Sequence, residues 1–102
     1  RELGPAEGMG LREGGACIVD VREQSEWEQG RMEGAALMPR GQVFERSGEL
    51  RTGRTVVVVW GSGNRSAQGR DILETAGFKT VSSMRGGMKA WQAQGYSVVT
   101  GP

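Results

Sequence analysis

The residues best suited to chemistry in this sequence are six consecutive positions that begin two residues after the last of four consecutive valines. They read Gly61-Ser62-Gly63-Asn64-Arg65-Ser66 and combine glycines, small polar side chains and one guanidinium. Glycine permits positive φ angles and close backbone approach, so this segment predicts a tight loop rich in amide N–H donors. Arg65 and Ser66 are predicted to begin a helix, whose N-terminus adds further donors. Such a ring of donors suits an anion or a sulfur nucleophile.

The residue at the end of the valine run, where a nucleophile would sit beside that ring, is Trp60. An indole N–H only donates hydrogen bonds, so Trp60 offers no lone pair for nucleophilic attack at neutral pH. Two interpretations of this side chain stay open. Its ring plugs the pocket from the strand end, which we favour, or it lies outward as an aromatic contact for a partner.

No other residue is an evident replacement for the nucleophile, because the chain has one cysteine and no histidine. Without histidine no Ser–His or Cys–His pair forms, so Ser62 and Ser66 are predicted to bond within the loop or cap the helix. Cys17 is predicted near the start of a strand, about 10 Å from the ligand-binding edge, as a small apolar core side chain. A single cysteine excludes an internal disulfide and a multi-cysteine metal site; we expect no metal and no cofactor.

The elements that position the loop follow from hydrophobic patterning. Residues 56–59 and 16–21 are apolar, β-branched runs and predict interior strands of a parallel sheet. Shorter strands are predicted at 35–38 and 80–83. A helix is predicted at 5–12, and a second runs from a capping box at Ser25–Glu28 to Gly30. A third helix is predicted because Gly69, Ile72, Leu73 and Ala76 share one helix face; Gly77 is its C-terminal cap, and Phe78 folds back against it. A fourth is predicted around Met88 and Trp91, with Gly95 as its C-terminal cap. This alternation indicates an α/β fold with a central, mostly parallel five-stranded sheet and helices on both faces. In such sheets ligands bind beyond the carboxyl ends of the strands, where the 60–66 loop lies.

The length and charge of the chain limit its domain number and the kinds of partner it can have. A chain of 102 residues predicts one domain over residues 1–102. Thirteen basic and twelve acidic side chains leave a net charge of +1, without a basic tail, so no nucleic-acid partner is expected. No apolar run approaches the roughly 20 residues of a membrane span and nothing resembles a signal peptide, so we expect a cytoplasmic location without membrane contact. A chain that begins at Arg1 is also compatible with a piece of a larger protein.

Five short segments in this order resemble the rhodanese-like (sulfurtransferase) domain family. They are Ile18-Val19-Asp20-Val21-Arg22-Glu23, Gly30-Arg31-Met32-Glu33-Gly34-Ala35 with Pro39, Gly61-Ser62-Gly63-Asn64-Arg65-Ser66, Ala76-Gly77-Phe78 and Gly86-Gly87-Met88-Lys89-Ala90-Trp91. The resemblance covers about residues 3–99. It implies a loop cysteine that takes a sulfane sulfur from thiosulfate or a similar donor, becomes a persulfide and passes the sulfur to a nucleophile. It also associates the six-residue span 60–65 with sulfur, since related phosphatase and arsenate-reductase domains carry one residue more.

This chain departs from the family pattern at two positions. Trp60 stands where the resemblance expects the cysteine, and Arg31 stands where it often has histidine, a change we interpret as structural. We therefore expect a rhodanese-like domain without thiosulfate sulfurtransferase activity, acting as an anion-binding, regulatory or protein-interaction module. The expected ligand is a small anion (sulfate, thiosulfate or phosphate) at the loop from Trp60 to Ser66, and a protein partner or a larger parent protein is a further expectation. The alternatives are sulfur transfer through Cys17 or a partner-supplied thiol, and a docking module without ligand chemistry.

Four charged side chains and two further tryptophans remain. Asp20 and Arg22 either line the rim of the pocket or brace neighbouring loops, and bracing is favoured. Arg65 either holds an acidic partner beneath the loop or presents its charge to an anion. Arg85 is a candidate for the rim or a solvated loop charge. Trp27 and Trp91 fall at helix positions and are predicted to pack in or near the core.

Overall fold

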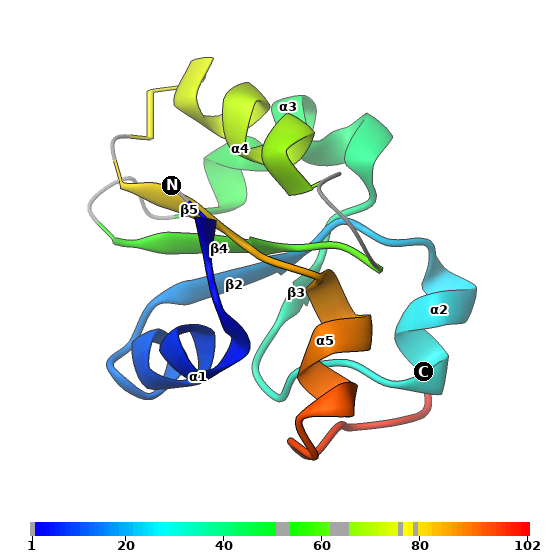
Figure 1. The fold of residues 1–102 in the computed structure, drawn as a ribbon. Helices are drawn as coiled ribbons and strands as arrows, with labels where there is room; N and C mark the ends of the chain where they lie inside the picture. The colour runs from blue at the N-terminus through cyan, green and yellow to red at the C-terminus, as the bar shows by residue number, and fades with distance from the viewer. Residues whose placement is uncertain (1, 51–53, 62–65, 76, 79) are drawn as a thin grey trace.

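The chain folds around one five-stranded sheet. The computed structural model describes residues 2–50, 54–61, 66–75, 77–78 and 80–102, without the side chains of 40 and 66–69. The strands are β1 (Glu2–Leu3), β2 (Cys17–Asp20), β3 (Ala36–Leu37), β4 (Val56–Val59) and β5 (Val81–Met84). They lie in the order β1-β5-β4-β2-β3, and the four pairings are parallel (Figure 1). The predicted α/β architecture is confirmed.

Helices cover both faces of the sheet. Figure 1 shows α3 (Val43–Arg46) and α4 (Ser66–Thr75) on one side, and α1 (Pro5–Glu13) and α5 (Gly87–Ala93) on the other. Helix α2 (Gln24–Gln29) follows the carboxyl end of β2, and two short 3-10 turns, η1 (Arg40–Gln42) and η2 (Ser47–Glu49), flank α3. None of the helices in the described segments has the length and apolar composition needed to cross a membrane.

Two hydrophobic cores, one on each face, explain the uninterrupted valines of β4. The α3–α4 core contains Val19, Val21, Met38, Val43, Val56, Val58, Leu73, Phe78 and Val81. The α1–α5 core contains Leu3, Ile18, Met32, Val57, Val59, Met84, Met88 and Trp91. Successive strand residues point to opposite faces, so alternate valines enter different cores and all four are buried. A central strand covered on both sides therefore needs no polar alternation.

The start of α2 differs from the prediction. Its N-cap is Glu23, with a capping box formed by Glu23 and Glu26, rather than a box over Ser25–Glu28. The Glu26 carboxylate accepts a hydrogen bond from the Glu23 N–H at 3.4 Å. A carboxylate accepts from the helix amides as a serine hydroxyl does, and the residue before it, Arg22, is already fixed by Asp20. The helix therefore begins earlier than a serine cap predicts.

Helix α4 ends as predicted. Gly77 has φ +103°, and the N–H of Phe78 donates to the carbonyl of Leu73 at 3.1 Å. Phe78 is buried and packs in the α3–α4 core. Ala76, predicted on the buried face of this helix, lies outside the described residues. Strand β1 was not predicted, because two residues that pair with Ser83 and Met84 carry no periodic signal.

Two glycines inside α1 have different surroundings, and this yields a stability prediction. A Cβ added at Gly8 would lie 3.1 Å from the Met84 sulfur, whereas one at Gly10 would meet nothing within 4 Å. Glycine inside a helix costs about 0.5–1 kcal/mol relative to alanine. We expect Gly10→Ala to raise the free energy of unfolding by that amount, and Gly8→Ala to gain less, because buried Met84 must move. Urea denaturation of both variants measures the difference; equal gains would contradict the close packing at Gly8.

Candidate functional site

The candidate site lies at the carboxyl ends of β2 and β4. Because these strands are parallel and Asp20 pairs with Val59, the residues that follow each strand emerge side by side. The N–H of Val21 donates to the carbonyl of Val59 at 3.0 Å and continues this alignment by one residue. Trp60 follows the last residue of β4, and Arg22 lies two residues beyond the end of β2. Helix α4 begins at Ser66, six residues after Trp60.

Trp60 is fixed at this edge through its backbone and its ring. Its carbonyl accepts a hydrogen bond from the N–H of Met88 at 2.8 Å, and the Gly61 carbonyl accepts one from Lys89 at 2.9 Å. The half-buried indole packs against the α3–α4 core. Two amides of the first turn of α5 therefore bind carbonyls of the loop and are not available to an anion.

The pair Gly86-Gly87 makes this contact possible. Both residues have positive φ angles, +75° and +57°. A Cβ added at Gly87 would lie 2.2 Å from the Trp60 carbonyl oxygen, far inside van der Waals contact. The sequence singled out this glycine pair only within a segment that resembles the rhodanese-like family. Its structural function is to let α5 approach the backbone that follows β4.

We expect Gly87→Ala to destabilise the protein more than Gly95→Ala does. Gly95 also has a positive φ, +81°, but a Cβ there meets nothing within 4 Å. The control thus isolates backbone strain, about 1–2 kcal/mol, and Gly87→Ala adds the clash with Trp60. Thermal unfolding with amide hydrogen exchange at Met88 and Lys89 measures both effects. Equal losses, with the exchange of these two amides unchanged, would contradict the proposed close approach.

Asp20 and Arg22 form a buried ion pair that ties β2 to α2. Their side chains are 1% and 6% exposed, and Arg22 Nη2 lies 2.7 Å from Asp20 Oδ2. Arg22 Nε donates to Oδ1 at 2.9 Å. The same guanidinium donates to the carbonyls of Gly30, at 2.7 Å, and Glu26, at 3.3 Å. The pair therefore holds the C-terminal part of α2 against the end of β2.

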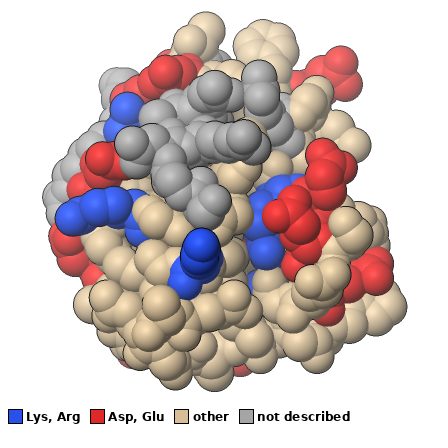
Figure 2. All heavy atoms as spheres, turned by 45° about the vertical axis from the view of Figure 1, so that its right-hand side comes forward, with Lys and Arg blue, Asp and Glu red and all other residues tan. Residues whose placement is uncertain are grey.

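A cleft of about 340 Å³ opens beside this pair, between α2 and α5. It is lined by Arg22, Glu26, Gln29, Gly30, Gly61, Met88, Lys89 and Gln92. Because Asp20 neutralises Arg22, the charges that face a ligand there are those of Lys89 and Glu26, which are both exposed. Figure 2 turns this side of the molecule forward and shows basic and acidic side chains lying next to one another. The cleft is therefore polar and of mixed charge.

The other predicted site residues lie apart from this cleft or outside the described chain. Arg85 is exposed, and its N–H donates to the Leu3 carbonyl at 2.7 Å, which places it beside β1. Cys17 is half-buried and pairs with Val56 at the amino ends of the strands. Residues 62–65, which include Ser62, Gly63, Asn64 and Arg65, lie outside the described residues, and Ser66 is described by its backbone alone.

Arg31, at the position where the resemblance expects histidine, anchors the C-terminal tail. Its guanidinium lies over the Trp27 ring at 4.4 Å and donates to the Gly101 carbonyl. Its backbone also pairs with Val99 in an antiparallel bridge. Trp91, 1% exposed, is buried as predicted, and its Nε1 donates to the Ser97 carbonyl at 3.0 Å. Arg31 therefore has a structural role in this chain.

Comparison with known proteins assigns the family. The model of the rhodanese-like domain matches residues 5–94, and the chain belongs to this family. The chain is 31% identical over 94 residues to the thiosulfate sulfurtransferase GlpE of Pseudomonas fluorescens, and this alignment covers 90% of this chain and 84% of GlpE. It is 34% identical over 74 residues to the putative sulfur carrier protein YrkF of Bacillus subtilis, covering 72% of this chain.

The family match extends to solved structures and to proteins of other lengths. A rhodanese-related protein from Thermoplasma volcanium superposes with a TM-score of 0.88 at 26% identity, covering 97% of each chain. This chain spans only 40% of the length of YrkF. The fold and the relation to sulfurtransferases are therefore established for this domain.

Two residues of the α2–α5 cleft, Arg22 and Gly61, were predicted site residues, whereas the others that line it were not: Glu26, Gln29, Gly30, Met88, Lys89 and Gln92. A signal for them exists, since Glu26 and Gln29 are three positions apart, as are Lys89 and Gln92. Residues at this spacing share one helix face. Each pair lines the cleft from its own helix. Neither pair indicates a site until the two helices are known to face each other.

Proposed function

We propose that this rhodanese-like domain does not carry sulfane sulfur on its own loop and serves instead as a binding module for a small anion. The observation that carries the proposal is Trp60 at the end of β4, the position of the family's cysteine by the resemblance. An indole forms no persulfide, because it has no thiolate to attack a sulfur donor. The packing of its ring and the bond from Met88 to its carbonyl keep Trp60 in place there.

The position of Cys17 supports the same proposal. This thiol is level with Val56 in the strand register, and Trp60 lies four residues further along the chain. At about 3.3 Å per residue, the two positions are about 13 Å apart along the strands. A sulfur donor held at the carboxyl edge is out of reach of Cys17.

Anion binding is supported by the elements that meet at the carboxyl edge. Helix α4 has ten residues and begins there at Ser66. Its N-terminal N–H groups and dipole favour negative charge. Lys89 adds an exposed ammonium on the α5 side of the cleft. Sulfate, thiosulfate and phosphate share the charge and size that such a site recognises, and its occupancy would serve a regulatory or protein-interaction role.

Sulfur transfer is tested by thiosulfate-dependent formation of thiocyanate from cyanide, with the natural chain and with Cys17→Ser. We expect both proteins to remain at the rate measured without protein. Turnover in the natural chain that disappears in Cys17→Ser would assign the chemistry to Cys17 and overturn the proposal. Turnover that both proteins share would overturn it as well.

Anion binding is tested by titrating thiosulfate into the isotope-labelled chain and following backbone amides by NMR. We expect saturable shifts at Gly61 and Lys89. Lys89→Gln should weaken binding about 2–5-fold, the effect of one exposed charge. Arg54→Gln removes the same charge at the opposite edge of the sheet and is the matched control. Absence of shifts, or equal weakening by both variants, would contradict binding at this edge.

A further inference from the structure

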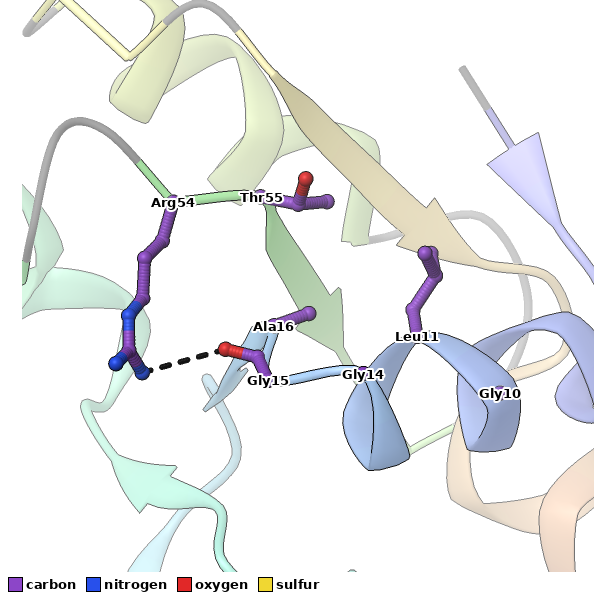
Figure 3. Close-up of a pocket in the computed structure, with 7 residues that line it drawn as sticks. All are labelled: Gly10, Leu11, Gly14, Gly15, Ala16, Arg54 and Thr55. Atoms are coloured by element: carbon purple, nitrogen blue, oxygen red, sulfur yellow. Dashed lines mark hydrogen bonds between the residues drawn. The ribbon is translucent and has the colours of Figure 1, made fainter.

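A second cavity lies at the amino ends of the strands, opposite the carboxyl ends where Trp60 lies. It has a volume of about 340 Å³ and is lined by Gly10, Leu11, Gly14, Gly15, Ala16, Arg54 and Thr55 (Figure 3). The end of α1, the turn into β2 and the residues before β4 form its walls. The N–H of Cys17 donates to the Thr55 carbonyl at 2.9 Å and holds the last two of these segments together.

The glycines of this cavity are only partly explained by the fold. Gly15 has φ +99° and needs glycine for its conformation. Gly14 has φ −80°, and a Cβ there would make ordinary contacts of 3.5 Å with two carbonyl oxygens. Gly10 lies inside a helix, where glycine is unfavourable, and a Cβ there would meet nothing within 4 Å. Positions that break a local preference without a packing reason are often functional.

A glycine at positions 10 and 14 keeps one wall of the cavity free of side chains. No side chain projects from this wall at these two positions, so a flat ring system can lie directly against the backbone. The remaining walls carry the apolar side chains of Leu11 and Ala16 and the hydroxyl of Thr55. In Figure 3 the side chains of Thr55 and Ala16 point toward the side on which Leu11 lies.

Arg54 supplies a charge on the other side of the cavity. Its Nη1 donates to the Gly15 carbonyl at 3.2 Å, which holds the exposed guanidinium beside the cavity (Figure 3). A guanidinium has five N–H donors, so this bond leaves donors for a ligand. Its planar, forked geometry matches a carboxylate, which accepts two parallel hydrogen bonds from it.

We propose that this cavity binds a small, flat organic carboxylate. The Arg54 guanidinium pairs with the carboxylate, and the flat body lies against the glycine wall between Leu11 and Ala16. The volume of about 340 Å³ is within the range of small-molecule sites. This site is separate from the anion site proposed at the carboxyl edge, because no residue lines both cavities among those described.

The test uses β-naphthoate as the probe, titrated into the isotope-labelled full chain and followed by amide NMR. We expect saturable shifts at Gly10, Gly14, Gly15 and Thr55. Naphthalenemethanol, which has the same ring system without the charge, should bind about tenfold more weakly, as should naphthoate to Arg54→Gln. Lys89→Gln should leave the affinity for naphthoate unchanged.

Filling the cavity supplies the second arm of the test. Gly10→Leu places a side chain in the open space and should weaken binding by at least about tenfold. Gly48→Leu is the matched control, because a Cβ at Gly48 also meets nothing within 4 Å and Gly48 does not line the cavity. Unchanged amide signals in the rest of the chain show that each variant is folded. If Gly10→Leu does not fold, Gly10→Ala introduces a smaller side chain at the same position.

Three results would overturn the proposal. The first is the absence of a saturable shift at the four amides with naphthoate at millimolar concentration. The second is equal affinity of Gly10→Leu and Gly48→Leu for naphthoate. The third is that the shifts occur at Gly61 and Lys89 instead, which would place the probe at the carboxyl edge.

Discussion

Trp60→Cys is expected to give this domain thiosulfate sulfurtransferase activity. The introduced thiolate attacks the outer sulfur of thiosulfate, the S–S bond breaks, and sulfite leaves while a persulfide forms. Cyanide then takes the outer persulfide sulfur as thiocyanate and restores the thiolate. We expect the N-terminus of α4, which begins at Ser66, to help stabilise the thiolate introduced at this position.

The expected gain in thiosulfate-dependent thiocyanate formation is at least about 100-fold over the natural chain, equivalent to about 2.7 kcal/mol of activation barrier. Trp60→Ser is the matched control, because it removes the same indole and introduces a side chain of similar size without a thiol. Adding Cys17→Ser to Trp60→Cys should leave the gained activity intact. A folded Trp60→Cys variant without turnover would show that the edge of the sheet no longer supports a thiolate.

Asp20→Asn is expected to lower the free energy of unfolding by about 3–5 kcal/mol, because it leaves the Arg22 guanidinium buried without its counter-charge. Arg22 is 6% exposed and cannot turn to water without releasing the carbonyls of Glu26 and Gly30. Typical domains are stable by only about 5–15 kcal/mol, so this loss is a large fraction of the total. Urea denaturation at neutral pH measures it.

Asp71→Asn provides the matched control for Asp20→Asn. Asp71 is 71% exposed, and its carboxylate lies 3.9 Å from Arg70 Nε. The same chemical change at this exposed pair should cost about 0–1 kcal/mol. Similar losses in the two variants would contradict the structural importance of the buried pair at the end of β2.

The architecture could be predicted from the sequence because its signals are local. The valines of β4 are buried on both faces, which removes polar alternation and marks a central strand before any partner is known. The sequence signal for the end of α4 consists of two adjacent residues, Gly77 and Phe78. Glu23 was missed as the N-cap of α2, since a serine two residues later offers the stronger pattern.

The candidate site could be predicted only where its parts are contiguous in sequence. Trp60 was placed at the end of a strand by the residues around it, and Cys17 near a strand start for the same reason. The bonds from Met88 and Lys89 to the loop carbonyls join segments about 28 residues apart, and no periodicity encodes such a meeting. The α2–α5 cleft depends on the same long-range packing.

The mass of the intact protein after incubation with thiosulfate shows whether this domain carries sulfane sulfur. We expect an unchanged mass for the natural chain. We expect an added mass of about 32 Da, one sulfur atom as a persulfide, for Trp60→Cys measured in parallel. The same added mass on the natural chain, located on Cys17 by peptide mapping, would overturn the proposed function.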